Sequence, residues 1–327
     1  MQYLIGVDIG GTNIKLALVD RKAHLRGKRT FSTTSFRGKR ALIDGIVSQI
    51  EGLISGAGLK KRDIIGVGIG APGAVDIRTG TVHYLTNIPD WREVPLGNIL
   101  RKRLSVPVFV DNDVNVMALG EVYFGSGHGA VNMLCITLGT GVGGGLILDG
   151  KLYRGSSYAA GEFGHVPINI DGPKCNCGSW ACVEAYVGNS YIVKDVISDI
   201  KGGRKTLITK LVGGDLAKIT PRIISEADRK GDKYAKKVWV DVGNKVGIGL
   251  AGVVNLLNVE KIVIGGGVAE AGKTLFDSIK KTVRARAMKL PAKTVKIVKA
   301  KLGYDAGLIG AATLVLYELG RENVTKK

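Results

Sequence analysis

Residues 4–20 read LIGVDIGGTNIKLALVD, and residues 133–149 read MLCITLGTGVGGGLILD. Each stretch is a run of β-forming residues, a glycine-rich turn and a second such run, and the two align without a gap, with Gly10 over Gly139. Each stretch therefore predicts a β-hairpin. One repeat at such a long spacing indicates two related halves rather than an array of short repeats.

Both turns have the composition of a phosphate-binding loop. Adjacent glycines leave backbone N–H groups open to phosphate oxygens, Thr12 adds a hydroxyl donor, and Asp8 is placed to hold Mg²⁺ through water. For either turn alone, a tight hairpin with glycine at positive φ is the alternative, but the matched pair favours phosphate binding. The predicted phosphate and nucleotide ligands here are Asp8, Gly10, Gly11, Thr12, Asn13, Lys15, Gly139, Thr140 and Gly141.

Two other nucleotide-binding motifs are disfavoured. Residues 139–144 fit the G-x-G-x-x-G pattern of dinucleotide enzymes, but residues 146–148 continue as a strand where that fingerprint requires a helix. Residues 68–73 fit the same pattern with Pro72 inside it, and no P-loop lysine motif is present. A Rossmann-type dehydrogenase is therefore not the preferred interpretation.

The remaining chain alternates predicted strands and helices, which indicates an α/β fold with two lobes. Apolar periodicity predicts helices over 41–55, 113–124, 182–201, 221–258, 271–288 and 306–319, and buried strands over 64–71, 106–110 and 261–264. No Pro/Ser-rich linker separates the lobes. We expect a small lobe of residues 1–117 with 305–327 and a large lobe of residues 118–304, hinged around a cleft.

Composition limits the classes of protein to consider. The chain has 327 residues, of which 45% are apolar, which suffices for two cores. Its net charge of +19 raises the possibility of a nucleic-acid partner, but the basic residues are dispersed and form no helix-turn-helix pattern, so a solvated basic surface is preferred. Without a signal peptide or an uninterrupted apolar run of about 18 residues, a cytoplasmic protein with no membrane span is expected.

Polar side chains follow the buried strand that ends at Val110. Asp111, Asn112 and Asp113 come next, and a kinase that acts on an alcohol needs a carboxylate to accept the hydroxyl proton. We predict that Asp113 is this base and that Asn112 fixes neighbouring hydroxyl groups. The alternative is that both residues only cap the helix that follows.

Further hydroxyl-binding groups are predicted in the second half of the chain. Glu162, His165 and Glu184 supply carboxylate and imidazole groups that can each bridge adjacent sugar hydroxyls. Glu162 taken alone is equally consistent with an exposed acid on a loop. A site built from such groups would reject analogues that lack a hydroxyl, because buried polar groups would be left unpaired.

Three of the four cysteines lie together, ten residues after a histidine. His165, Cys175, Cys177 and Cys182 form a Cys₃His set that matches a closed, structural zinc site. Zinc would hold one ring nitrogen of His165 and leave the other to a sugar hydroxyl. Cys135 lies in an apolar strand and is most simply a buried thiol.

The sequence resembles the ROK family (repressor, open reading frame, kinase), and within it the ATP-dependent glucokinases, over essentially its whole length. The resemblance rests on the turns at 8–13 and 138–145, Gly70-Ala71-Pro72-Gly73, Asn112-Asp113, Glu162-x-Gly164-His165 with the cysteines, and Gly265-Gly266-Gly267. The glutamate–histidine–cysteine constellation is specific to the family, whereas the single turns are shared with the wider hexokinase–actin superfamily.

The resemblance implies two ribonuclease-H-like lobes that close over a sugar and ATP. It implies that Asp113 is the base, that Asn112, Glu162, His165 and Glu184 bind the sugar with Gly73 and Asn87, and that Gly265, Gly266 and Gly267 lie beside the adenosine. It also implies a homodimer or homotetramer. Two positions depart from the usual pattern: Ala181 replaces a glycine before the last cysteine, and Asp111 stands where glutamate is common.

The preferred function is phosphoryl transfer from ATP–Mg²⁺ to a hexose, with glucose O6 as the expected acceptor. A kinase for N-acetylglucosamine, N-acetylmannosamine, mannose, fructose or several sugars is the main alternative. A sugar-sensing repressor is disfavoured, because such proteins carry a DNA-binding segment ahead of the sugar domain and the first turn here begins at Asp8. Polyphosphate as the donor fits the charge, but the 265–267 turn favours a nucleotide.

Overall fold

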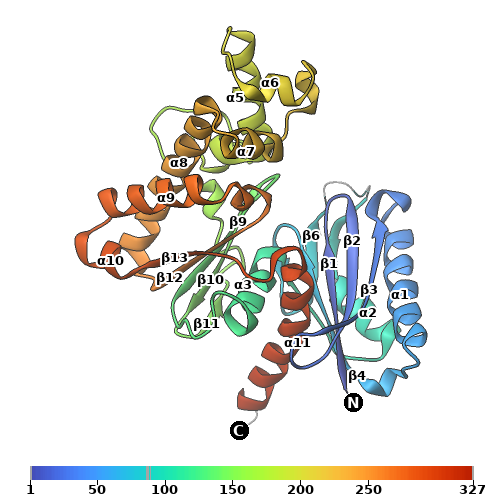
Figure 1. Ribbon diagram of the computed structural model, residues 1–327. Coiled ribbons are helices and arrows are strands. Elements are labelled where there is room, and N and C mark those ends of the chain that lie inside the picture. Colours follow the sequence, from blue (N-terminus) through green and yellow to red (C-terminus); the bar gives the residue numbers. More distant parts are fainter. Residues whose placement is uncertain (1, 86–87, 89, 326–327) are drawn as a thin grey trace. The chain divides into compact units, whose positions relative to one another are not determined.

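The computed structural model describes residues 2–85, 88 and 90–325, with side chains to residue 321, and shows a mixed α/β chain (Figure 1). The strands are β1 (Tyr3–Ile9), β2 (Asn13–Val19), β3 (Leu25–Ser32), β4 (Ile64–Ala71), β5 (Val75–Asp76), β6 (Thr81–Tyr84), β7 (Arg92–Val94), β8 (Val108–Asn112), β9 (Met133–Leu138), β10 (Val142–Leu148), β11 (Lys151–Tyr153), β12 (Lys261–Gly265) and β13 (Lys296–Lys299). The α-helices are α1 (Lys39–Gly56), α2 (Leu96–Leu104), α3 (Asp113–Phe124), α4 (Glu184–Val187), α5 (Asn189–Lys201), α6 (Leu207–Leu211), α7 (Pro221–Arg229), α8 (Lys233–Leu257), α9 (Lys273–Arg286), α10 (Lys289–Thr294) and α11 (Ala306–Thr325).

Two five-stranded sheets repeat the same topology. One has the order β3-β2-β1-β4-β8 and the other β11-β10-β9-β12-β13, and a small sheet has the order β5-β6-β7. In the first, β1 runs antiparallel to β2 and parallel to β4. In the second, β12 runs parallel to both β9 and β13. This duplicated order is the ribonuclease-H-like arrangement, so the predicted fold class of the hexokinase–actin superfamily is confirmed.

The chain forms two compact units. The first comprises residues 1–129, 145–161 and 301–327, and the second comprises residues 130–144 and 162–300. The predicted lobe boundary at 117/118 falls inside α3, which belongs wholly to the first unit. The predicted division into a small and a large lobe therefore differs in detail from these units and stays a prediction.

Strand β1 shows how the first unit is built. Ile5, Val7 and Ile9 lie on one side of the sheet and join the buried cluster that includes apolar residues of α1 and α2. Leu4 points to the other side, where it packs with α11. This period of two is what a strand buried on both faces requires. Helices α1 and α11 consequently cover opposite faces of the sheet (Figure 1).

Helix α11 approaches the sheet unusually closely, because the strands carry glycine beneath it. A Cβ atom on Gly6 would lie 2.0 Å from the carbonyl oxygen of Leu308, and one on Gly68 would lie 1.7 Å from that of Ala311. Gly310 makes the matching approach to α3, with a Cβ position 2.0 Å from the oxygen of Val116. These contacts fix α11 against β1, β4 and α3, of which β1 carries Asp8 and α3 begins at Asp113.

Helix α8 is the central helix of the second unit. It packs on α9 through Gly243 and Gly247, whose added Cβ atoms would each lie 2.6 Å from a side-chain carbon of Ser278 or Thr282. In the described part of the chain, α8 is also the one helix whose length and composition would allow it to cross a membrane. Its buried face, with Trp239 fully enclosed, is typical of a core helix, so this composition is weak evidence for a span.

Two segments that were each predicted as one helix are each two helices in the structure. The helix predicted over 221–258 is two helices, α7 and α8, separated at Gly231, which has φ = +86°. The positive φ suits glycine and ends α7, and Asp232 then caps α8 by accepting the N–H of Ala235. The helix predicted over 182–201 is likewise α4 and α5, separated at Gly188.

Candidate functional site

The first glycine-rich turn joins β1 to β2 and is held by hydrogen bonds from Thr33, the residue that follows β3. The Gly10 N–H donates to the Asn13 carbonyl oxygen at 2.9 Å, which closes the turn. The Thr33 hydroxyl donates to the Gly10 carbonyl oxygen at 2.9 Å, and the Thr33 N–H donates to that of Thr12 at 2.8 Å. Gly11, Thr12 and Asn13 themselves are exposed. The turn is therefore a fixed loop whose tip faces solvent, as a phosphate-binding loop requires.

Asp8 lies at the base of this turn, against the start of α11. Its Oδ2 atom is 3.8 Å from the Nζ atom of Lys15, and a Cβ atom on Gly307 would lie 2.8 Å from its carboxyl carbon. Burial raises the pKa of Asp8, and the charge of Lys15 partly offsets this rise. A carboxylate held at an energetic cost beside a predicted phosphate-binding turn is typical of a functional group rather than a structural one.

Asn112 and Asp113 stand at the junction of β8 and α3. Asn112 Oδ1 accepts the N–H groups of Val114 at 2.8 Å and Asn115 at 3.2 Å, so Asn112 caps α3. Its Nδ2 atom donates to the carbonyl oxygen of Gly73 at 3.1 Å, which brings two predicted sugar ligands together. Asp113 is the first residue of α3 and its Oδ1 atom accepts the N–H of Val114 at 2.9 Å. Capping and a role at the site are thus compatible for this pair.

A buried ion-pair network that the sequence did not reveal lies directly behind this segment. Asp111 is 2% exposed, and its Oδ1 atom accepts the N–H of Asn112 at 2.7 Å and the Nδ2 atom of Asn115 at 2.9 Å. Its Oδ2 atom accepts Nε of Arg154 at 2.7 Å, while Nη2 of Arg154 donates to Glu318 Oε1 at 2.5 Å. Both acids raise the pKa of Arg154 against the opposing effect of its burial. The network fixes the backbone that carries Asn112.

The second turn, between β9 and β10, is organised by Glu184. Glu184 Oε2 accepts the N–H of Val142 at 2.8 Å, and a Cβ atom on Gly141 would lie 2.8 Å from the same oxygen. The Gly139 carbonyl oxygen accepts the N–H of Asn189 at 2.9 Å, which ties the turn to the start of α5. A side chain at 141 would therefore displace the Glu184 carboxylate from its bond to Val142, so Glu184 positions this turn whatever else it binds.

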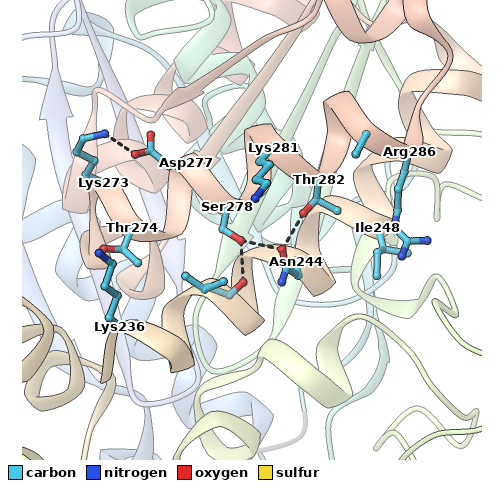
Figure 2. Close-up of a pocket in the computed structure, with 12 residues that line it drawn as sticks. Lys236, Asn244, Ile248, Lys273, Thr274, Asp277, Ser278, Lys281, Thr282 and Arg286 are labelled. Carbon is cyan, nitrogen blue, oxygen red and sulfur yellow. Dashed lines mark hydrogen bonds and ion pairs between the residues drawn. The ribbon is translucent and has the colours of Figure 1, made fainter. Parts of the chain in front are cut away.

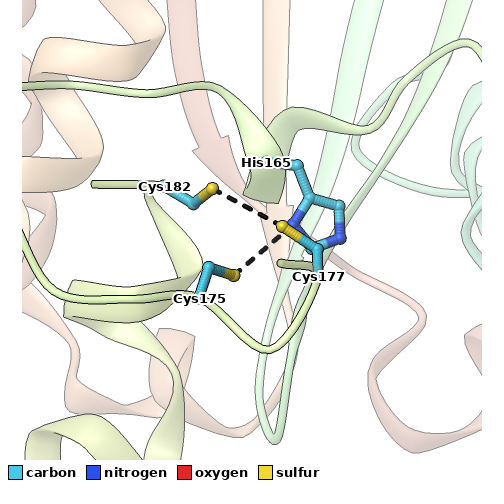
Figure 3. Close-up of side chains that lie close together, drawn as sticks. All are labelled: His165, Cys175, Cys177 and Cys182. Carbon is cyan, nitrogen blue, oxygen red and sulfur yellow. Dashed lines mark hydrogen bonds between the residues drawn. The ribbon is translucent and has the colours of Figure 1, made fainter. Parts of the chain in front are cut away.

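The predicted zinc ligands converge in the second unit (Figure 3). One ligand atom each from His165, Cys175, Cys177 and Cys182 lies within 4.8 Å of all the others. The Sγ atom of Cys175 is 3.8 Å from Nδ1 of His165, and the Sγ atoms of Cys177 and Cys182 are 3.8 Å apart. Tetrahedral zinc with Zn–S bonds of about 2.3 Å would place two sulfur atoms about 3.8 Å apart. The donor set and its spacing fit a structural zinc ion.

The acidity of the three thiols differs within this cluster. Burial raises the pKa of Cys175 to about 12 and raises that of Cys182. The backbone N–H of Ser179 lowers the pKa of the exposed Cys177. Thiolates are the ligands that a metal binds, so a bound cation would have to compensate for the burial of two sulfur atoms.

His165 and Glu162 lie on one side of this cluster. Nε2 of His165 is 3.9 Å from Oε2 of Glu162, whereas Nδ1 faces Cys175. Gly164 between them has no room for a side chain, since a Cβ atom would lie 2.0 Å from the carbonyl oxygen of Val142. The cluster, the histidine, the glutamate and the second turn are therefore one connected assembly, as the prediction that zinc orients His165 requires.

The third glycine-rich turn follows β12. Gly266 has φ = +87°, and a Cβ atom there would lie 2.3 Å from the carbonyl oxygen of Leu138. The turn thus packs against the end of β9, next to the second glycine-rich turn, while Gly266 and Gly267 remain exposed. Asn87, the remaining predicted sugar ligand, lies outside the described residues.

A groove of about 700 Å³ between α8 and α9 contains none of the predicted site residues (Figure 2). Asn244 Oδ1 accepts the hydroxyl groups of Ser278 and Thr282, each at 2.9 Å, across its floor. Its charged lining consists of Lys236, Lys273, Asp277, Lys281 and Arg286, of which Lys273 and Asp277 form an ion pair. We assign this groove no part in the site.

The model of the ROK family matches residues 4–318. The chain belongs to the ROK family. Among ROK relatives, the glucokinase of Halalkalibacterium halodurans is 36% identical over 96% of this chain and 95% of its own length. The solved structure of a ROK glucokinase from Streptomyces griseus in complex with glucose and AMPPNP is 36% identical, with a TM-score of 0.80, and the match covers 95% of this chain and 98% of that one.

Repressors of the ROK family are also similar to this chain. The xylose repressor of Caldicellulosiruptor bescii is 28% identical over 97% of this chain and 78% of its own length. The family therefore contains both catalytic and regulatory proteins that share this fold, and membership alone does not decide between them.

Proposed function

We propose that this ROK protein is an ATP-dependent sugar kinase that phosphorylates a hexose, with glucose O6 as the acceptor. The observation that supports this most is the Asn112–Asp113 segment. It presents a carboxylate beside an asparagine that is bonded to Gly73, and a buried ion pair holds it from behind. The glucokinase relatives at 36% identity support the same assignment of substrate.

In the proposed reaction, Asp113 accepts the proton of the sugar hydroxyl as the phosphoryl group arrives. Glu162, His165, Glu184 and Asn112, with Gly73 and Asn87, orient the sugar. Backbone N–H groups of the two β-hairpin turns bind the phosphates, and the 265–267 turn lies beside the adenosine. Mg²⁺, bound to ATP and to Asp8 through water, would neutralise phosphate charge. A structural zinc ion held by His165 and the three cysteines would fix the sugar-binding loop.

The remaining expectations belong to this proposal as well. The enzyme works in the cytoplasm as a homodimer or homotetramer, without a membrane or nucleic-acid partner. Its small lobe (residues 1–117 and 305–327) and large lobe (118–304) close over the substrates. Closure excludes water and so limits hydrolysis of ATP.

The decisive experiment is a coupled assay of ADP release with a panel of glucose, mannose, fructose, N-acetylglucosamine and N-acetylmannosamine. The proposal expects the highest kcat/KM with glucose. A higher kcat/KM with another sugar would support the kinase activity but show that glucose is not the preferred substrate. Binding of sugars by calorimetry without any sugar-dependent ADP release would instead favour a sugar-sensing regulator, the second function represented in this family.

A further inference from the structure

A pocket of about 320 Å³ lies within the first unit, and its lining includes Arg154, the ion-pair partner of Asp111. This volume is at the lower end of the range of about 300–1,000 Å³ for sites that bind small molecules. Its lining comes from the β5–β6 turn, α2, β8, the residue that follows β11, and α11. The charged residues of this lining are Arg78, Arg101, Arg154, Glu318 and Arg321.

Four guanidinium groups therefore converge on one pocket whose lining holds a single carboxylate. Arg154 is the buried member, with its side chain 5% exposed. Tyr317 places its ring against two of the four, since the guanidinium carbon of Arg154 lies 5.8 Å and that of Arg321 lies 5.6 Å from the ring centroid. Arg78 is likewise 5.6 Å from the ring centroid of Tyr158. Stacked guanidinium groups keep their N–H edges available for an anion.

In the part of the chain whose side chains are described, the cationic groups around the pocket outnumber their carboxylate partners. Arg154 shares Asp111 and Glu318, Arg321 lies 3.5 Å from the same Glu318, and the carboxylate bonded to Arg78 is Asp76 at 3.4 Å. Arg101 donates to an uncharged partner, the carbonyl oxygen of Val108, at 2.9 Å. Among the residues whose side chains the structure describes, three carboxylates thus contact four guanidinium groups, and an anion would offset the excess positive charge of this set.

We propose that this pocket binds the phosphate group of a small molecule and that its occupancy regulates the kinase through Arg154 and Asp111. Guanidinium groups bind phosphate oxygens through paired N–H donors, which favours phosphate over a monovalent anion such as chloride. The free phosphate ion and a phosphorylated sugar share this chemistry.

The regulatory part follows from the bonding of one side chain and rests on the proposed function. Arg154 divides its N–H groups between Glu318 at the pocket wall and Asp111 behind the catalytic segment. A phosphate group that draws the guanidinium toward the pocket weakens its hold on Asp111, whose Oδ1 atom fixes the N–H of Asn112. Occupancy should therefore lower kcat rather than raise the KM for either substrate.

Binding is tested first, by calorimetry without sugar or ATP, using inorganic phosphate in one arm and glucose 6-phosphate in the other. The variant Arg78→Gln/Arg321→Gln removes two exposed guanidinium groups and leaves the buried Arg154–Asp111 ion pair in place. Arg229→Gln removes one exposed guanidinium group from α7, outside the pocket, and serves as the control. We expect the double variant to bind the better of the two probes at least about tenfold more weakly than the wild type and the control.

Equal affinity in the wild type and the double variant, or no binding of either probe by the wild type, would refute the proposed phosphate site.

Kinetics then test the coupling with glucose and ATP each varied to saturation, and the kcat and KM values with the probe are divided by those of the same protein without it. The proposal expects a several-fold fall of kcat in the wild type and the control, and none in the double variant. A probe that only raises KM binds the catalytic site, and that result overturns the coupling. If the protein has no kinase activity, the proposed function is refuted. The calorimetry still tests independently whether the pocket binds phosphate.

Discussion

The Nε atom of Arg154 donates a 2.7 Å hydrogen bond to Oδ2 of Asp111, one position before the asparagine that caps α3. Both side chains are almost completely buried. The charge pair therefore sits in a low-dielectric environment, where loss of one partner leaves the other uncompensated.

Replacing Arg154 with methionine should destabilise the protein by about 3–5 kcal/mol, because the mutation leaves Asp111 charged and buried. Chemical denaturation monitored by circular dichroism measures this loss. Arg154→Lys should destabilise the protein less, because lysine keeps the positive charge, although it cannot bond Asp111 and Glu318 with the geometry of a guanidinium group. Arg229→Gln should change stability by no more than about 0.5 kcal/mol. A loss below about 1 kcal/mol for the methionine variant would show that the pair is not structurally important.

Asp113→Asn should lower kcat by about 10²–10⁴-fold and leave glucose affinity within a few-fold of wild type, because the amide cannot accept the hydroxyl proton. The amide oxygen can still accept the N–H of Val114, so α3 should start at the same place. Steady-state kinetics and calorimetry measure the two quantities. Asp195→Asn, an exposed change in α5, is the control. A turnover number within threefold of wild type would exclude Asp113 as the base.

Cys177→Ser should abolish zinc binding and lower both the melting temperature and the affinity for glucose, because the loop that carries His165 loses its anchor. Elemental analysis should find one zinc ion per wild-type chain and none in the variant. Cys135→Ala, in strand β9 and outside the cluster, should keep its zinc. Wild-type protein purified in zinc-containing medium that carries no metal would refute the metal site.

Asp8→Asn should remove kinase activity yet raise the melting temperature at pH 7. Burial raises the pKa of Asp8, so the folded state binds its proton more tightly than the unfolded chain does. The carboxyl group therefore supports stability in acid and loses this contribution as pH rises through its folded pKa. Thermal unfolding at pH 7 and about pH 4 should show that the advantage of the variant shrinks in acid. A variant that melts below wild type at pH 7 contradicts this assignment.

Two glycine-to-alanine changes should have opposite effects on stability. Gly68→Ala places a Cβ atom 1.7 Å from the backbone oxygen of Ala311, so it should cost at least about 1–3 kcal/mol. Gly252→Ala lies in α8 with no neighbouring atom within 4 Å, so it should stabilise the protein by up to about 1 kcal/mol. Denaturant titration of both variants decides the matter. Similar effects in the two would mean that α11 can move away from the sheet.

Local patterns predicted much of the fold. Helix α3 begins at Asp113 and ends at Phe124 as predicted, because a capping asparagine precedes an apolar run and a glycine follows it. The helix predicted across Gly231 was wrong, since its apolar pattern continues through a turn whose glycine and aspartate mark a boundary. The polar strand β3 and the short helix α2 were not predicted, because their buried faces are narrow.

In the candidate site, too, local sequence patterns predicted some features, whereas features that depend on tertiary contacts were missed. Motifs predicted the cysteine cluster and both turns, since each is contiguous or nearly so in the chain. The role of Glu184 beside Gly141 and the pairing of Arg154 with Asp111 were missed, because each joins residues about 43 positions apart through tertiary contacts that no local pattern specifies.

The close packing of α11 on β1 and β4 also constrains how the protein is made. Leu308, Ala312 and Val315 cover apolar residues of β1 and β4, which leave the ribosome about 250–300 residues earlier. Until translation is almost finished, the first sheet therefore has one uncovered apolar face, which is a surface for chaperones. Ribosomes stalled before residue 306 should carry nascent chains whose first sheet is open to protease, however completely the preceding segments have folded.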